Sequence, residues 1–102
     1  MGQAPVDRYI LETLMPDLVG HDRAPSAFLV YLFLWYQAAP SDGWRVEVSH
    51  RAIADGTGLS KRIIQTAIHH LIRRRLLSAD RDTITAIPVY TVLRPWARRG
   101  RG

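Results

Sequence analysis

The chain has 102 residues, which is enough for one hydrophobic core but not for two. Its hydrophobic fraction of 47% and charged fraction of 23% are ordinary for a globular protein. No apolar run reaches the ~18 residues of a membrane span, and the N-terminus has no secretory pattern, so we expect no membrane partner. The absence of cysteine excludes disulfides and thiol catalysis and favours a cytoplasmic location.

Positive charge is concentrated in the C-terminal part of the chain. Residues 1–59 contain four arginines and seven acidic residues, a net charge of −3. Residues 60–102 contain ten basic and two acidic residues, a net charge of +8, and the chain as a whole carries +5. Because phosphates attract a basic surface, this asymmetry favours a nucleic-acid partner.

A short amphipathic helix is predicted within residues 1–22. Pro16 should end or kink it near Met15, and residues 20–24 should form a loop. This helix should present an apolar stripe, which either packs over the core of its own chain or forms a homodimer contact. The apolar residues at helical spacing are Val6, Ile10, Leu11, Leu14 and Leu18.

Residues 26–39 predict the central helix of the core, because they are apolar on most sides. Pro25 suits the first turn of this helix, and a Pro-Ser-Asp-Gly turn at residues 40–43 closes it. Residues 44–48 alternate between apolar and polar side chains and predict a short strand. The aromatic residues of the helix that we expect in the core are Phe28, Phe33, Trp35 and Tyr36.

Two short helices joined by a glycine-bearing turn are predicted next. Ser49 suits the N-cap of a helix from His50 to about Thr57, and Gly58 permits a left-handed turn. Ser60 then caps a second helix, which should run to residue 75. One face of this second helix should pack on helix 26–39 through an apolar stripe of Ile64, Ala67, Ile68 and Leu71.

Two strands should follow, over residues 76–79 and 83–93, joined at Asp80-Arg81-Asp82. Pro88 interrupts the longer strand, which favours an edge position or a break there. The basic, glycine-containing residues 94–102 predict a flexible tail.

Residues 44–93 resemble the winged helix-turn-helix of bacterial regulators, especially those of the GntR and MarR type. The matching positions are Ile53-Ala54, Gly58-Leu59-Ser60, Ile64, Ala67-Ile68, Leu71 and Leu76-Leu77. The family usually carries glycine where Arg75 stands. The resemblance implies a mainly α fold with a small β-hairpin (α+β), in which three helices form the core and residues 76–93 form the wing.

The expected organisation has three parts. Residues 1–22 are an N-terminal helical extension, residues 23–93 are the winged helix-turn-helix domain, and residues 94–102 are the basic tail. So short a chain leaves no room for a separate ligand-sensing domain, so no small-molecule ligand is expected.

The resemblance also implies that helix 60–75 enters the DNA major groove and reads bases with its N-terminal half. Lysine or arginine can bond guanine and glutamine can bond adenine, each worth roughly 1–3 kcal/mol of discrimination. The positions that this assigns to DNA are Ser60, Lys61, Arg62, Gln65, Thr66 and His69. Weaker candidates are Arg73, Arg81 at the wing tip between two aspartates, and Arg98 and Arg99 in the tail.

The function that these residues favour is binding of double-stranded DNA, as a small transcriptional regulator. Two alternatives stay open: a DNA-binding component of plasmid or phage replication or partition, and a winged-helix module that binds other proteins. A possible homodimer through the N-terminal helix would place two recognition helices about 34 Å apart on a palindromic site.

No enzyme activity, cofactor or metal is expected. The sequence has no Ser-His-Asp order, no shielded pair of acids and no phosphate-binding glycine loop. His69 and His70 are adjacent on a helix, so they point about 100° apart and cannot share an ion. No histidine pair stands four residues apart with a carboxylate partner.

Overall fold

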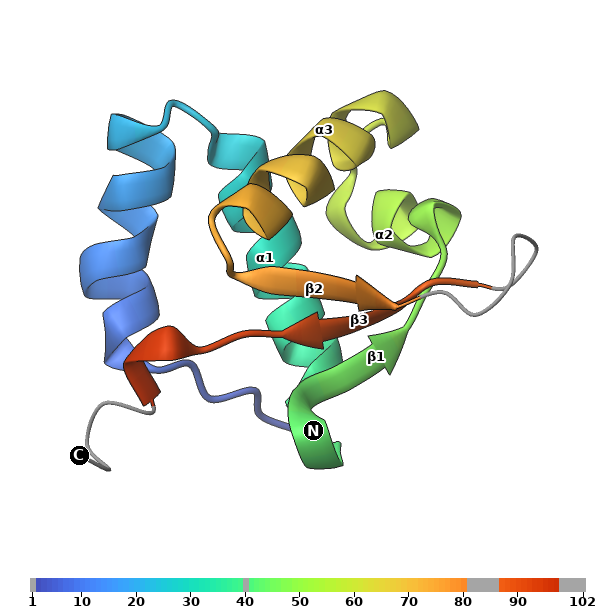
Figure 1. The fold of residues 1–102 in the computed structure, drawn as a ribbon, viewed down its shortest axis with the longest axis horizontal. Helices are drawn as coiled ribbons and strands as arrows, with labels where there is room; N and C mark the ends of the chain where they lie inside the picture. The colour runs from blue at the N-terminus through green and yellow to red at the C-terminus, as the bar shows by residue number, and fades with distance from the viewer. Residues whose placement is uncertain (1, 40, 81–86, 98–102) are drawn as a thin grey trace.

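The computed structural model describes residues 2–39, 41–80 and 87–97. The fold is mainly helical with a small three-stranded antiparallel sheet, so the α+β class is confirmed (Figure 1). None of the helices in the described part of the chain is long and apolar enough to cross a membrane. After an N-terminal helix at residues 8–21, the elements are α1 (Pro25–Ala38), β1 (Arg45–Glu47), α2 (His50–Thr57), α3 (Lys61–Arg73), β2 (Leu77–Asp80) and β3 (Val89–Val92).

One helical segment ends with Met15 as its C-cap and Pro16 begins the next, so the interruption predicted near Met15 is a boundary between two segments across which the helical path continues. Two π-helical segments, Ile10–Leu14 and Pro16–His21, follow one another and carry the helix to His21. Pro16 takes the first position of the second segment, where its fixed φ is suited to a helix and a backbone N–H is not required. The helix runs alongside α1 (Figure 1).

The N-terminal helix shares one core with the rest of the chain. Ile10, Leu14 and Leu18 are all buried in the cluster that α1 and α3 also line. The stripe predicted in residues 1–22 therefore packs mainly over its own chain. Three other apolar residues of the helix stay exposed, namely Leu11, Met15 and Val19.

α1 is the central helix, as predicted. Phe28 and Trp35 are buried and Phe33 is half-buried, but Tyr36 is 56% exposed, so its predicted place in the core is wrong. Leu29, two turns earlier on α1, is also 45% exposed, so this side of the helix is not fully covered. The predicted stripe of α3 is confirmed, with buried Ile64, Ala67, Ile68 and Leu71.

The helix ends around α2 and α3 follow the sequence closely. The Ser49 hydroxyl accepts a hydrogen bond from the Ala52 N–H (3.1 Å), and the Ser60 hydroxyl accepts one from the Ile63 N–H (3.2 Å). Gly58 ends α2 with a φ of 82°. α3 ends at Arg73 rather than at Arg75, because Arg75 adopts a φ of 59° and turns the chain into β2.

The strand order is β1-β3-β2, so β3 is the central strand. Pro88 directly precedes it, and its carbonyl accepts a hydrogen bond from the Val48 N–H (3.2 Å). β3 begins only after Pro88, and its place between β1 and β2 makes the predicted edge position wrong. Residues 83–86 of the predicted strand lie outside the described residues, so the alternative of a break at Pro88 stays a prediction. A proline is tolerated here because it stands just outside the ladder. Arg81, at the predicted wing tip, lies outside the described residues.

Residues 94–97 are fixed against the start of the chain. The Trp96 ring stacks on Tyr9 with 4.5 Å between ring centroids, and its indole N–H donates to the Asp7 carboxylate (3.1 Å). The Arg94 guanidinium lies 4.1 Å from the centroid of the Trp44 ring. The prediction of a flexible tail is therefore wrong for residues 94–97, where aromatic stacking outweighs the basic composition. Arg98 and Arg99 lie outside the described residues.

Candidate nucleic-acid interface

α3 presents a polar face to solvent. Because the apolar stripe packs inward on α1, the remaining side chains of the helix, apart from the partly buried His70, are exposed. All of the predicted DNA-contacting residues of this region are exposed: Ser60, Lys61, Arg62, Gln65, Thr66, His69 and Arg73. α3 contains no acidic residue, so this face is neutral or positive along its whole length.

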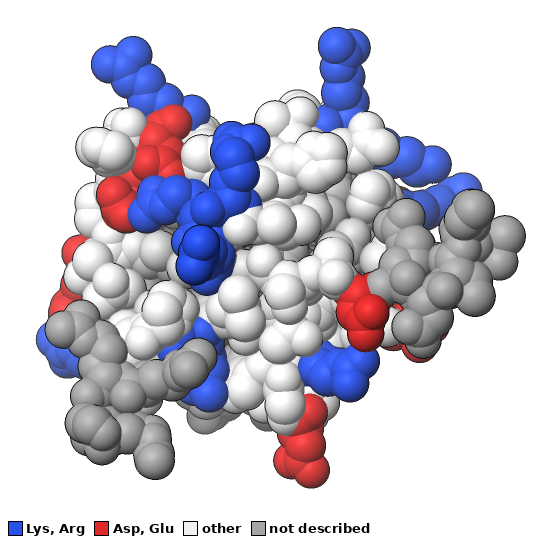
Figure 2. All heavy atoms as spheres, in the orientation of Figure 1, with Lys and Arg blue, Asp and Glu red and all other residues white. Residues whose placement is uncertain are grey.

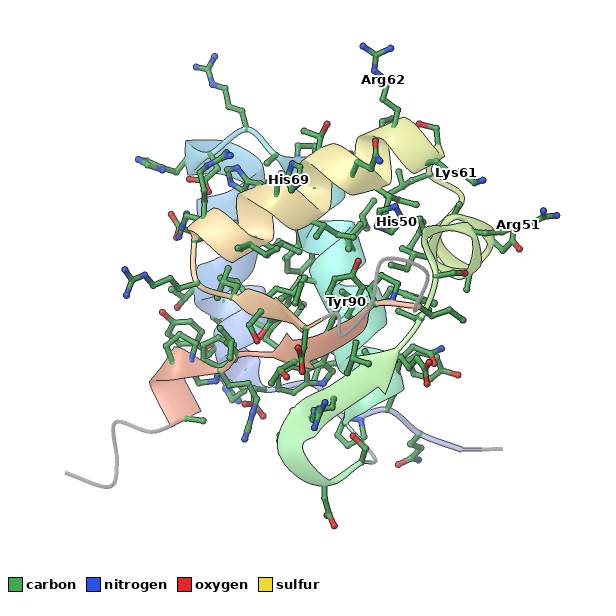
Figure 3. All side chains as sticks on the ribbon, turned by 45° about the vertical axis from the view of Figure 1, so that its right-hand side comes forward. His50, Arg51, Lys61, Arg62, His69 and Tyr90 are labelled. Carbon is green, nitrogen blue, oxygen red and sulfur yellow. The ribbon has the colours of Figure 1, made fainter. Side chains whose placement is uncertain are left out.

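The N-terminal end of α3 carries exposed cations. Arg62 points away from the body of the molecule, and Lys61 lies at the same end as Arg51 of α2 (Figure 3). The ion pairs formed within residues 2–39, 41–80 and 87–97 involve none of these three side chains. Asp55 is the only acidic residue of α2. This end of the helix pair is therefore a local concentration of positive charge, and Arg51 is a member that sequence reasoning missed.

At the C-terminal end of α3, one arginine is paired with carboxylates of the same chain. The Arg74 guanidinium donates hydrogen bonds to the carboxylates of Asp17 and Asp22, which belong to the N-terminal helix and the residue after it. The His70 Nε2 atom lies 2.7 Å from Oδ2 of Asp22. Asp22 has a side-chain exposure of only 8%, so this network fastens α3 to the N-terminal helix.

Hydrogen bonding holds the Asp22 carboxyl in its charged form. The hydrogen bond with His21 is the largest cause that lowers the pKa of Asp22. The hydrogen bond with His70 and the positive charge of Arg74 act in the same direction, and the pKa falls to about 2 although burial of the carboxyl raises it. The two carboxylates raise the pKa of Arg74 further above its already high value. Arg74 is therefore a fixed internal cation.

A hollow of about 270 Å³ opens between α3 and the sheet. It is lined by Gln65 and His69 of α3, by His50 of α2 and by Tyr90 of β3. The His50 Nε2 atom is 3.2 Å from the Tyr90 hydroxyl, so these two side chains are held together (Figure 3). Sequence reasoning missed His50 and Tyr90 as neighbours of the candidate base-reading residues, because they come from elements far apart in the chain.

The charged and uncharged parts of this side of the molecule are separated. Lys and Arg side chains stand near both ends of α3, with mainly uncharged side chains between them (Figure 2). The structure thus brings together the predicted residues of the N-terminal half of α3, whereas Arg73 lies at the opposite end. Searches of protein-family models, curated proteins and solved structures give no match for this chain.

Proposed function

We propose that the protein is a winged helix-turn-helix protein that binds double-stranded DNA and acts as a small transcriptional regulator. α3 would enter the major groove, and the β2–β3 hairpin would lie beside it as the wing. The observation that carries the proposal is the exposed N-terminal half of α3, where Lys61 and Arg62 stand beside Gln65 and form none of the ion pairs of the described residues.

Each side chain of this face suits a contact of its own kind. Gln65 can bond adenine with both polar atoms of its amide, and Arg62 can bond guanine in the same way. Lys61 and Arg51 stand at the end of the helix pair, where phosphates would pass, and the N-terminus of α3 adds backbone donors. Thr66 and His69 would contact bases or phosphates further along the groove.

The remaining proposed contacts would strengthen binding without specifying sequence. Arg81 would approach the minor groove from the tip of the wing, where a narrow groove attracts arginine. Arg98 and Arg99 would contact phosphates. Arg73 is an exposed cation at the far end of α3 and would add a phosphate contact there.

We also propose a homodimer through the N-terminal helix. Its contact surface is smaller than the apolar stripe predicted from sequence, because Ile10, Leu14 and Leu18 are buried in the core of their own chain. Leu11, Met15 and Val19 are 48%, 37% and 38% exposed on the outward side of that helix. A charge introduced by Met15→Glu should therefore shift a dimer towards monomer in sedimentation velocity. A wild-type protein that is monomeric at every concentration tested would remove the dimer from the proposal.

The experiment measures binding of the full chain to duplex DNA by fluorescence anisotropy at two salt concentrations. Random duplexes are used first, followed by duplexes selected from a genomic pool. The variant Arg62→Ala with Gln65→Ala should bind selected DNA at least tenfold more weakly, because each lost base contact is worth roughly 1–3 kcal/mol. Selection also gives the target site and its symmetry.

The matched control is Arg8→Ala with Gln37→Ala, which removes the same two side-chain types from the N-terminal helix and α1. Arg8 and Gln37 are both exposed, so the control should fold and bind like wild type. Absence of wild-type binding at low salt would contradict DNA binding, and equal loss in the control would contradict the assignment to α3. Repeated target sites at a replication origin would favour the replication or partition alternative over regulation.

Binding to another protein is the alternative outcome. It is favoured by a hollow of about 330 Å³ between α1 and α2, which Leu29, Phe33 and Tyr36 line. Leu29 and Tyr36 are 45% and 56% exposed, which is unusual for large apolar side chains on a central helix. A winged-helix module that binds proteins would show weak DNA binding with little dependence on salt.

A further inference from the structure

Three side chains with metal-binding atoms meet at the end of the N-terminal helix. Asp17 and His21 are four residues apart, and Asp22 follows directly. The His21 Nδ1 atom lies 2.9 Å from Oδ1 of Asp22 and 3.8 Å from Oδ1 of Asp17. One donor atom from each of the three residues lies within 4.8 Å of the others.

We propose that Asp17, His21 and Asp22 form a binding site for one divalent transition-metal ion, such as Zn²⁺. Ligands of a tetrahedral zinc ion stand about 2.0–2.2 Å from the metal, which places them about 3.3 Å from one another. The His21 Nδ1 atom lies 2.9 Å and 3.8 Å from the two Oδ1 atoms, and the three donor atoms lie within 4.8 Å of one another, so a bound ion would replace the hydrogen bond between His21 and Asp22 and draw Asp17 inward. Water would take the remaining position.

The two aspartates are oriented by residues of α3. Arg74 contacts Oδ2 of both carboxylates, and His70 lies 2.7 Å from Oδ2 of Asp22. The Oδ1 atoms are therefore the ones that face His21. Hydrogen bonds to the far oxygen of a carboxylate ligand are a common way to fix its orientation around a metal.

The charges of the cluster are compatible with a bound cation. The Asp22 carboxylate lies against the Arg74 guanidinium and His70, an arrangement that favours its charged form. Two carboxylates and the Arg74 guanidinium leave one negative charge, so a divalent ion would not be strongly repelled. The guanidinium donates to the Oδ2 atoms of both carboxylates, whereas the Oδ1 atoms are the ones near His21.

The donor set selects the class of ion. One imidazole with two carboxylates suits zinc, cobalt, nickel or manganese, whereas magnesium and calcium prefer oxygen ligands alone. The side chain of His21 is 81% exposed, so an ion can reach the site without opening the core. Because Arg74 and His70 belong to α3 and its C-terminal end, a bound ion would also tighten the packing of α3 against the N-terminal helix.

The test is a titration of the untagged full chain, cleared of metal with a chelator, with ZnCl₂ in the absence of DNA. Calorimetry should show one ion per chain, and the Tm should rise with zinc concentration, since an ion that binds only the folded state stabilises it. CoCl₂ should give the visible absorption of a protein-bound cobalt ion. MgCl₂ in excess should not displace either ion.

The decisive variant is His21→Ala, which removes a ligand from an exposed position. Its metal-free Tm should be lower than that of wild type, because the bond between His21 and Asp22 is lost, and its Tm should not rise with zinc. Asp17→Asn should weaken zinc binding as well. The control His69→Ala removes another exposed histidine, from α3 outside the cluster, and should bind zinc like wild type.

Three results would overturn the site: no zinc or cobalt binding by wild type, wild-type binding by His21→Ala, or loss of binding in His69→Ala. None of these measurements involves DNA, so their failure is separate from failure of the proposed function. The sequence contains one signal for this cluster, the spacing of Asp17 and His21. A search for paired histidines misses it, because the partner of His21 at that spacing is an aspartate.

Discussion

The two ends of α3 both carry basic residues but use them differently. At the first turn, Lys61 and Arg62 are exposed and absent from the ion pairs of the described residues. After the last turn, Arg74 is hydrogen-bonded to Asp17 and Asp22. A guanidinium that already has two carboxylates has little capacity left for a phosphate. A run of arginines in a sequence therefore says less about DNA binding than the position of each one does.

The largest expected effect comes from Arg74→Ala. Removing this cation leaves the mostly buried Asp22 carboxylate without its main charged partner, and we expect a loss of about 2–3 kcal/mol in the free energy of unfolding. Urea denaturation measures it. The control is Arg73→Ala, which removes an exposed neighbouring arginine and should change stability by less than about 0.5 kcal/mol. Equal losses in the two variants would mean that Arg74 does not hold the two elements together.

Acid should weaken the same network. The folded-state pKa of Asp22 is about 2, below the ordinary value of 3.8, so its contribution to stability is complete above pH 3.8. It is then lost as the pH falls through about 2, because the unfolded chain takes up the proton first. Urea unfolding between neutral pH and pH 2 should show this decline, and Asp22→Asn should reduce it. An equally steep decline in that variant would assign the acid sensitivity to other carboxyls.

The salt dependence of DNA binding distinguishes the two ends directly. Lys61→Ala should lower affinity and reduce the slope of log K against log salt by about 1, because Lys61 is proposed to contact a phosphate. Arg74→Ala, measured where it is still folded, should leave the slope unchanged, because its charge is neutralised within the protein. Equal slopes for both variants would remove the distinction between the ends.

A smaller effect is expected where α3 joins β2. Arg75 holds a φ of 59°, a region that glycine enters without strain. Arg75→Gly should therefore raise the free energy of unfolding by about 0.5 kcal/mol, since the relief of strain slightly exceeds the entropic cost of glycine. Thermal unfolding should show a small rise in Tm. A fall would mean that contacts of the Arg75 side chain outweigh the strain.

Local features of the fold are predictable from sequence because they depend on residues a few positions apart. The caps at Ser49 and Ser60 and the left-handed Gly58 involve only neighbouring backbone groups. The buried stripe of α3 follows from helical periodicity alone. These features also locate the exposed face on which the candidate DNA site stands.

Two of the wrong predictions concern places where distant parts of the chain meet. Residues 94–97 have the composition of a flexible tail, but Trp96 stacks on Tyr9. Pro88 is compatible with either an edge strand or a break, and pairing with both β1 and β2 makes β3 the central strand. Neither outcome can be read from the residues on either side of these positions.

The order of the amino acids is enough to specify the helices, their caps and the division of α3 into a buried and an exposed face. Which cations near α3 are committed to ion pairs depends instead on tertiary packing. Arg74 and Asp17 are 57 positions apart, and no periodic pattern connects them. Helix geometry is encoded within a few residues, whereas the partner of a charge depends on how the whole chain packs.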